Sequence, residues 1–236
     1  MSSSSNLSRC TGECADRETW PSRSWPGWPE WRRSTSPVGN DVVDLRHPLC
    51  QPEAIHPRFD TRVFTAGERA LLAASSQAHR TRWSLWAAKE SAFKASRRID
   101  SRVRFLPRDF AVHLSGERAE VVHRSGRFEV WLDHTDDWVH AVASRSAQRP
   151  GFQLDGDPTA EPGDEEERGS ERVRRLARST LGALLNIAPS EVEIVSEDRI
   201  PRAQRRGVPV PCDLSLSHDG RFVSCAWELI DPFDFV

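Results

Sequence analysis

The spacing of hydrophobic residues along the chain predicts an alternation of strands and helices. Short apolar stretches bounded by turn residues are typical of strands, and apolar residues three or four positions apart are typical of helices. Strands are predicted at Val38–Leu45, Phe110–Leu114, Ala119–Val122, Arg127–Leu132, Trp138–Ala143, Val192–Val195, Leu214–Ser217 and Phe222–Trp227. Helices are predicted at Thr65–Ala74, Thr81–Arg97 and Glu171–Leu185.

Turn and cap residues support several of these boundaries. Thr65 and Glu68 have the spacing of a capping box, in which each side chain binds the backbone N–H of the other residue. Asp219-Gly220 predicts a hairpin turn between the last two strands. Gly39-Asn40 predicts a further turn within the first strand region.

The predicted elements group into two lobes. We expect a first lobe at 37–146, a solvated linker rich in Pro, Gly and acidic residues at 147–170, and a second lobe at 171–236. Residues 1–36 are rich in Ser, Pro and Trp and fit neither period, so they are predicted to be a disordered tail. The alternative for this tail is a tryptophan-rich strip that docks on the body or on a partner.

The two lobes share a sequence pattern. Residues 130–135 and 138–139 align without a gap on residues 214–219 and 222–223, with a histidine, His134 or His218, at each turn. Apolar positions coincide, so we interpret the pattern as an internal duplication. The predicted fold is therefore α+β, with two lobes related by a pseudo-twofold axis, each an antiparallel sheet packed with helices. A cleft between such lobes is a favoured place for a binding site.

Charge and cysteine content narrow the class of protein. The net charge of −2 points to no nucleic-acid partner, but the acidic segment 155–171 leaves the rest of the chain mildly basic, which fits a phosphate-bearing ligand. The five cysteines show no paired spacing and are interpreted as reduced thiols of a cytoplasmic protein. The sequence shows no apolar segment long enough to cross a membrane, so no membrane partner is expected.

One helix carries a polar face with candidate chemistry. Trp86, Glu90 and Lys94 stand four residues apart on the predicted helix Thr81–Arg97. A Glu-Lys pair at this spacing is usually a surface ion pair. Trp86 on the same face favours instead a side that points inward or into a cleft.

The first strand ends with two carboxylates, Asp41 and Asp44, three residues apart. Carboxylates there can cap a turn. Together with Glu90, they can instead form the oxygen-rich site that Mg²⁺ prefers, completed by water and phosphate oxygens. An enzyme that transfers phosphate groups needs such a site to neutralise a diphosphate.

The terminal hairpin carries Ser217 and His218 next to each other. Neighbours on a strand point to opposite faces, which argues against a serine hydrolase pair. The histidine can instead donate to a phosphate oxygen. Upstream lies a basic loop with Arg205 and Arg206, which are either simply solvated or bind a polyphosphate.

Four segments together resemble the 4′-phosphopantetheinyl transferase superfamily. Gly39–Leu45 resembles the family's G-x-D-(I/V)-x-(E/D) metal-binding strand, and Arg62–Glu68 resembles the segment that follows it. Trp86–Ala95 closely resembles the W-x-x-K-E-(A/S)-x-x-K-A helix. Leu216–Val223 resembles the (I/L)-S-H-(S/D)-G-x-x-(V/A) hairpin. The tail and the acidic linker have no counterpart.

The resemblance implies a Mg²⁺-dependent enzyme of the holo-[acyl-carrier-protein] synthase type, with coenzyme A as co-substrate. It would transfer 4′-phosphopantetheine to a serine of an apo carrier protein and release 3′,5′-ADP. Asp41 and Glu90 would hold Mg²⁺, with Asp44 at or near the site. Glu90 would also help to deprotonate the carrier serine.

The resemblance also implies coenzyme A contacts. Lys94 would bind the diphosphate and steady the leaving 3′,5′-ADP, and Ser217 and His218 would contact phosphates from the other lobe. Val208 stands where some members carry a basic residue in G-(K/R)-P, so Arg205 or Arg206 would make that contact.

The order of the lobes departs from the family's larger members. Here the metal-binding lobe comes first and the Ser-His lobe last, so we expect a permuted, monomeric pseudo-dimer with one active site between the lobes. The first lobe has Asp133 where the hairpin serine is expected, so its hairpin is predicted to be the non-catalytic copy.

Two other functions remain open from the sequence. One is a degenerate module that binds coenzyme A or a carrier protein without transfer. The other is a different Mg²⁺-dependent phosphotransferase or nucleotide-binding enzyme. Carrier proteins or domains of fatty acid, polyketide and nonribosomal peptide synthesis are all possible partners.

Overall fold

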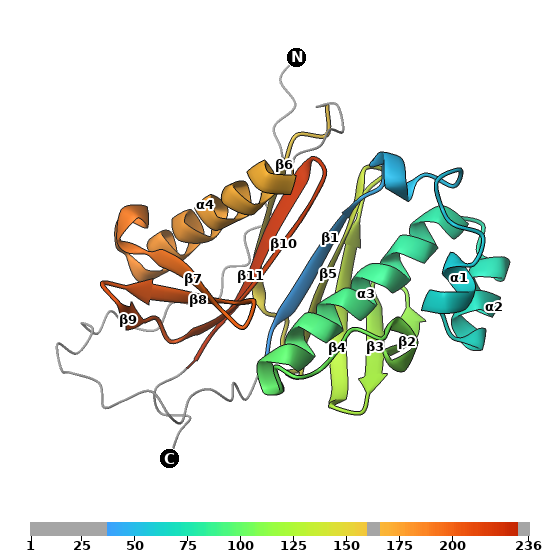
Figure 1. The fold of residues 1–236 in the computed structure, drawn as a ribbon, viewed down its shortest axis with the longest axis horizontal. Helices are drawn as coiled ribbons and strands as arrows, with labels where there is room; N and C mark the ends of the chain where they lie inside the picture. Colours follow the sequence, from blue (N-terminus) through green and yellow to red (C-terminus); the bar gives the residue numbers. More distant parts are fainter. Residues whose placement is uncertain (1–36, 160–165, 231–236) are drawn as a thin grey trace.

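Two lobes lie side by side in the computed structural model (Figure 1). The structure describes residues 37–159 and 166–230. In the second range, side chains are described from residue 169 onward. The first lobe contains β1 (Gly39–Asp44), η1 (Pro48–Cys50), α1 (Phe59–Val63), α2 (Ala66–Ala74), α3 (Ala78–Ile99), η2 (Pro107–Asp109), β2 (Ala111–Ser115), β3 (Arg118–His123), β4 (Gly126–His134) and β5 (Trp138–Ser144). The second contains β6 (Gly151–Gly156), α4 (Glu166–Leu185), η3 (Pro189–Glu191), β7 (Glu193–Glu197), β8 (Ile200–Arg205), β9 (Val208–Pro209), β10 (Cys212–Asp219) and β11 (Phe222–Leu229). This confirms the predicted α+β fold; the tail at 1–36 and residues 160–165 of the predicted linker lie outside the described residues.

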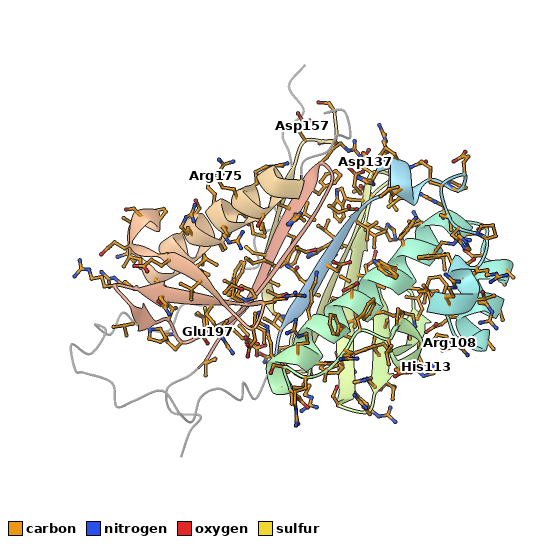
Figure 2. All side chains as sticks on the ribbon, viewed as in Figure 1. Arg108, His113, Asp137, Asp157, Arg175 and Glu197 are labelled. Carbon is orange, nitrogen blue, oxygen red and sulfur yellow. The ribbon has the colours of Figure 1, made fainter. Side chains whose placement is uncertain are left out.

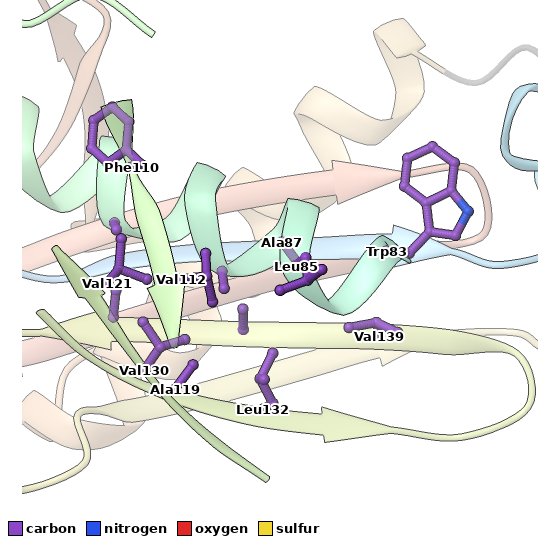
Figure 3. Packing of buried hydrophobic residues seen from close by; sticks show 14 of the residues in the cluster. Trp83, Leu85, Ala87, Phe110, Val112, Ala119, Val121, Val130, Leu132 and Val139 are labelled. Atoms are coloured by element: carbon purple, nitrogen blue, oxygen red, sulfur yellow. The ribbon is translucent and has the colours of Figure 1, made fainter. Parts of the chain in front are cut away.

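The first lobe is an antiparallel sheet in the order β1-β5-β4-β3-β2, with α3 packed across it. Figure 3 shows Leu85 and Ala87 of α3 over strand residues such as Val130 and Leu132. These side chains are almost fully buried, and the alanines of the inward face of α3 let the helix axis approach the sheet closely.

The closest approach between β1 and α3 occurs at Gly39. A Cβ atom at this position would lie 1.9 Å from the carbonyl oxygen of Ser91 and 2.6 Å from the amide nitrogen of Ala95. Glycine is required here for lack of space. The turn predicted at Gly39-Asn40 was wrong, because both residues lie within β1.

A buried lysine ties α3 to its neighbours. Lys89 is fully buried, and its ammonium group donates to Glu68 at 2.8 Å, to the carbonyl of Phe110 at 2.6 Å and to that of Pro107 at 3.1 Å. Glu68 also accepts from Thr65 N in the predicted capping box, which is confirmed, and from Val112 N. The lysine that precedes Glu90 therefore fixes the position of α3.

The second lobe has a sheet in the order β10-β11-β6 and a smaller sheet in the order β7-β8-β9. Helix α4 packs on β10 and β11 through Val173, Ala177 and Leu181, which belong to the apolar stripe seen in the sequence. Helices α3 and α4 both begin earlier than predicted, at Ala78 and Glu166. The basic loop predicted before the hairpin contains the strand β8.

Residues 151–156 were predicted to be part of a solvated linker, but they form β6, which pairs antiparallel with β11. Its sequence, Gly-Phe-Gln-Leu-Asp-Gly, is too short to show a clear alternation of apolar and polar residues. Because acidic residues follow it closely, the whole segment was predicted to be a solvated linker. The division of the chain into domains at the predicted boundaries stays a prediction.

The two predicted hairpins have equivalent registers. In the β4–β5 hairpin, His134 pairs with Val139, and in the β10–β11 hairpin, His218 pairs with Val223. Strand β1 lies beside β5 as β6 lies beside β11, so the order of strands is also repeated. The predicted duplication thus accounts for the strand order β1-β5-β4 in the first lobe and β6-β11-β10 in the second.

The lobes meet along β1 and β10, the edge strands of their sheets, which run side by side (Figure 1). Alternate backbone N–H groups of β1 and its preceding residue donate to side-chain oxygens of β10. These pairs are Val38 N to Asp213 Oδ2 at 2.9 Å, Asn40 N to Ser215 Oγ at 2.9 Å, Val42 N to Ser217 Oγ at 3.2 Å and Asp44 N to Asp219 Oδ2 at 2.8 Å. We call this row the side-chain ladder.

The side-chain ladder solves a hydrogen-bonding problem. The N–H groups of an edge strand need acceptors when they are buried. Asp213 at one end of the ladder is itself buried and ion-paired with Arg98 of α3, so this end of the interface is fixed by a buried charged pair.

Three cysteines, Cys50, Cys212 and Cys225, are buried free thiols in the described part of the chain. The same part contains no helix long and apolar enough to cross a membrane.

We predict that Glu68→Ala destabilises the protein by about 3–5 kcal/mol, because it removes a helix cap and leaves the Lys89 ammonium buried without its carboxylate. Urea unfolding followed by circular dichroism measures the change. Glu120→Ala is the control, since the Glu120–Arg127 pair lies at the surface and should contribute at most about 1 kcal/mol. Equal losses in the two variants would contradict the structural role of Lys89.

Candidate active site

A cleft of about 460 Å³ lies between the lobes at the end of the side-chain ladder. It is lined from the first lobe by Asp41, Glu90 and Lys94, and from the second by Ser217 and His218. Five of the eight predicted site residues are therefore brought together, although they are up to 177 positions apart in the sequence.

Lys94 connects the two sides of this cleft. Its ammonium group donates to Asp41 Oδ1 at 2.7 Å, to the carbonyl of Asn40 at 2.8 Å and to Ser217 Oγ at 3.2 Å. The Ser217 hydroxyl donates to the same oxygen of Asp41 at 2.9 Å. A carboxylate from β1, an ammonium from α3 and a hydroxyl from β10 thus form one hydrogen-bonded cluster.

Glu90 lies one turn before Lys94 on α3 and faces the same cleft. Burial raises its pKa to about 7, the nearby negative charge of Asp41 adds to the effect, and Lys94 opposes it. Trp83 and Trp86 also line the cleft. A carboxyl group with this pKa can accept or release a proton near neutral pH.

Asp219 also lines the cleft, although it was predicted only as part of the hairpin turn. It follows His218 in the hairpin, and burial raises its pKa to about 6 despite the hydrogen bond from Asp44 N. The charges of Asp41 and Asp44 add to this rise. The signal in the sequence was the alternation Asp213, Ser215, Ser217, Asp219, which places these side chains on one face of the strand.

Asp44 does not line the cleft. Its carboxylate is fully buried and binds the Arg221 guanidinium through two hydrogen bonds of 2.8 and 2.7 Å, and it accepts from the backbone N–H groups of Arg46 and Arg221. Burial alone would raise its pKa, but the hydrogen bonds from Arg221 hold the pKa below its usual value. Asp44 is thus committed to a bidentate ion pair between the lobes.

The same end of the molecule is held by further contacts of Arg221. Its guanidinium lies 3.5 Å from Asp137, which is labelled in Figure 2 and also pairs with Arg46. Arg221 in addition donates to the carbonyl of Pro158. The hairpin turn that carries His218 and Asp219 is therefore fixed to the first lobe.

His218 packs against α4. A Cβ atom at Gly169, in the first turns of this helix, would lie 2.8 Å from the Nδ1 atom of the His218 ring. The imidazole is thus placed between the N-terminal part of a helix and the cleft, a location that favours a negatively charged ligand.

Arg205 and Arg206 are not brought to the cleft. Both guanidinium groups pair with Glu191 of η3, at 3.0 and 3.1 Å, and neither residue lines the cleft. The sequence shows four arginines at 199–206 but not which of them a local carboxylate would bind.

The carboxylates of the cleft fit a hard divalent cation in their chemistry. In the described residues, no three His, Cys, Asp or Glu side chains are gathered into a ready-made metal cage. Mg²⁺ does not require one, because it is usually held by one or two carboxylates together with water and phosphate oxygens. Asp41, Glu90 and Asp219 supply such oxygens, and their mutual repulsion is what a cation would relieve.

Comparison with known proteins identifies a family for the first lobe. Residues 37–143 match the model of the 4′-phosphopantetheinyl transferase superfamily. A solved structure of holo-[acyl-carrier-protein] synthase from Thermotoga maritima aligns with a TM-score of 0.37 and 17% identity, covering 73% of this chain and 83% of that chain. No curated protein sequence matches this chain. The matched region includes Asp41, Glu90 and Lys94 but ends before the hairpin with Ser217.

We predict that Glu90→Gln stabilises the metal-free protein at pH 8. The pKa of Glu90 is raised in the folded state, so its ionisation destabilises the fold as pH rises from about 4.5 to about 7. The neutral glutamine avoids this cost, and a gain of roughly 1–3 kcal/mol is expected above pH 7, vanishing near pH 4.5. Urea unfolding with EDTA at pH 5 and pH 8 measures the difference; a variant less stable than the parent at pH 8 would refute the assignment.

Proposed function

Because residues 37–143 match the model of the 4′-phosphopantetheinyl transferase superfamily, we propose that this chain transfers the 4′-phosphopantetheine arm of coenzyme A to a serine of an apo carrier protein, in a Mg²⁺-dependent reaction of the holo-[acyl-carrier-protein] synthase type. The observation that carries the proposal is the cleft in which Asp41, Glu90 and Lys94 of the first lobe face Ser217 and His218 of the second. The predicted cytoplasmic location and monomeric state are part of the proposal.

Asp41 and Glu90 are the proposed metal-holding residues, and Asp219 lies near enough to add a third carboxylate. Bound Mg²⁺ would neutralise the diphosphate and stabilise the charge that develops on it. Asp44 is left out of the proposed ligands, because both of its oxygens are engaged by Arg221.

Glu90 is the proposed general base. The carrier serine oxygen attacks the phosphorus on the pantetheine side of the diphosphate, and the bond to the leaving oxygen of 3′,5′-ADP breaks. The serine proton passes to Glu90, directly or through water. Burial and the neighbouring charge of Asp41 raise the pKa of Glu90 in the metal-free protein, which makes it the most basic carboxylate proposed for this step.

Lys94 is the proposed diphosphate-binding cation. An ammonium group has three N–H donors, and all three are used on Asn40, Asp41 and Ser217. Lys94 therefore exchanges one of these partners for a phosphate oxygen when coenzyme A binds. His218 approaches the phosphates from the second lobe, whereas Arg205 and Arg206 are not included among the proposed contacts.

The proposal is tested by incubating the protein with coenzyme A, Mg²⁺ and a panel of apo carrier proteins from fatty acid, polyketide and nonribosomal peptide synthesis. Intact-mass spectrometry of each carrier should show the gain of one phosphopantetheine arm. EDTA should prevent this gain and Mg²⁺ should restore it. Binding of coenzyme A without transfer to any carrier would favour the degenerate binding module, and binding of ATP but not coenzyme A would favour another phosphotransferase.

Glu90→Ala is predicted to lower the rate of transfer by at least about 100-fold, because it removes the base and a metal ligand. Glu120→Ala, which alters only a surface ion pair of the same lobe, should retain the parent rate. Steady-state rates from the mass assay measure both variants. A Glu90→Ala variant with near-normal rates would refute the assignment.

A further inference from the structure

The Ser217 hydroxyl has no hydrogen-bonding capacity left for a substrate. It donates to Asp41 Oδ1 at 2.9 Å and accepts from Val42 N and Lys94 Nζ, both at 3.2 Å. A hydroxyl has one donor and two acceptor positions, so all are in use. The residue is only 6% exposed. A phosphate oxygen can only accept a hydrogen bond, so it could bind Ser217 only by taking the single O–H that now donates to Asp41.

The three partners of Ser217 all belong to the first lobe, two on β1 and one on α3. Val42 N belongs to the side-chain ladder, and its hydrogen bond to Ser217 fixes the register of β10 along β1. Asp41 is the carboxylate of β1, and Lys94 is the cation of α3. One hydroxyl of the second lobe thus sets the relative position of two charged groups of the first lobe.

We propose that Ser217 is a positioning residue for the metal site and does not contact the coenzyme A phosphates. Its hydroxyl orients the Asp41 carboxylate and keeps Lys94 beside it, so that the carboxylate faces the cleft before any ligand arrives. The inference rests on the proposed function in that the metal is the one this superfamily uses. It departs from the phosphate contact that the hairpin motif predicted.

The orientation of Asp41 matters because its side chain is the carboxylate of β1 that lines the cleft together with Glu90. Among the described residues, Lys94 is the side-chain donor to Asp41 Oδ1 that remains when Ser217 is removed. Because the lysine side chain is long and flexible, the Asp41 carboxylate is then free to adopt other rotamers. Groups that orient a metal ligand through a hydrogen bond typically change metal affinity by 10- to 100-fold when they are removed. A lower metal affinity is therefore the specific consequence of losing this hydroxyl.

Ser215 provides a matched control. It lies two residues earlier on the same face of β10, is equally buried, and accepts from Asn40 N at 2.9 Å in the next pair of the ladder. Within the described part of the chain, its hydroxyl makes no hydrogen bond to Asp41 or Lys94, and Ser215 does not line this cleft. Ser215→Ala thus removes a ladder hydrogen bond but leaves the charged cluster in place.

The experiment measures binding of Mn²⁺, a paramagnetic substitute for Mg²⁺, to the full chain without coenzyme A, by electron paramagnetic resonance. Ser217→Ala is expected to raise the Mn²⁺ dissociation constant roughly tenfold or more. Ser215→Ala should leave it within about twofold, at a comparable loss of thermal stability. Ser217→Cys, which nearly preserves the side-chain volume, serves as a second variant and should give an intermediate affinity.

A phosphate contact would give the opposite pattern. The KM for coenzyme A at saturating Mg²⁺ would then rise in Ser217→Ala while Mn²⁺ affinity stays at the parent value, and this outcome would overturn the proposal. Equal loss of Mn²⁺ affinity in the Ser215 and Ser217 variants would also overturn it, since the effect would then be general loosening of the interface.

Failure of the proposed function can be told apart from failure of this inference. The Mn²⁺ titration needs neither coenzyme A nor a carrier protein. If the parent chain binds Mn²⁺ through Asp41, as Asp41→Asn would show, but modifies no carrier, then the positioning role of Ser217 stands while the transferase proposal falls.

Discussion

The backbone N–H groups along the outer edge of β1 have their acceptors on side chains of β10, a strand that belongs to another sheet. If the backbones of β1 and β10 were hydrogen-bonded directly to each other, the two sheets would form one continuous sheet. Here the side chains of Asp213, Ser215, Ser217 and Asp219 intervene and hold the sheets apart by the length of a side chain. The arrangement leaves β1 available on its other edge for pairing with β5.

The candidate site follows from this constraint. Because each β10 side chain is fixed to a particular amide of β1, Ser217 and Asp219 stand beside Asp41 without any freedom of register. The Asp44–Arg221 pair closes the ladder at the cleft end, and the Arg98–Asp213 pair closes it at the other end. The charged residues of the first lobe and the hairpin turn of the second therefore meet at one place.

Much of this arrangement was readable from the sequence. The fold class, the capping box at Thr65 and the duplicated hairpins follow from local spacing, and the structure agrees with them. The gathering of Asp41, Glu90 and Lys94 was implied by the family resemblance, and the structure places all three around one cleft. Local spacing did not predict β6, because a central position beside β11 is a tertiary property that its own residues hardly reveal.

The roles of the polar residues of β10 were also out of reach of local spacing. Alternating Asp and Ser side chains on a strand normally indicate a face toward solvent. Here that face is buried against the other lobe, at 1% exposure for Asp213 and 2% for Ser215. Likewise, Asp44 looked like a metal ligand because Arg221, its partner, lies 177 positions away.

The distance in sequence between β1 and β10 has a consequence for how the chain is made. The two strands run with a constant offset of 175 positions, so the amides of β1 leave the ribosome long before their acceptors do. Until the last hairpin is synthesised, the nascent first lobe exposes an unpaired strand edge, the kind of surface that recruits foreign strands. Docking of the β10–β11 hairpin is then the step that both completes the cleft between the lobes and ends this vulnerable interval.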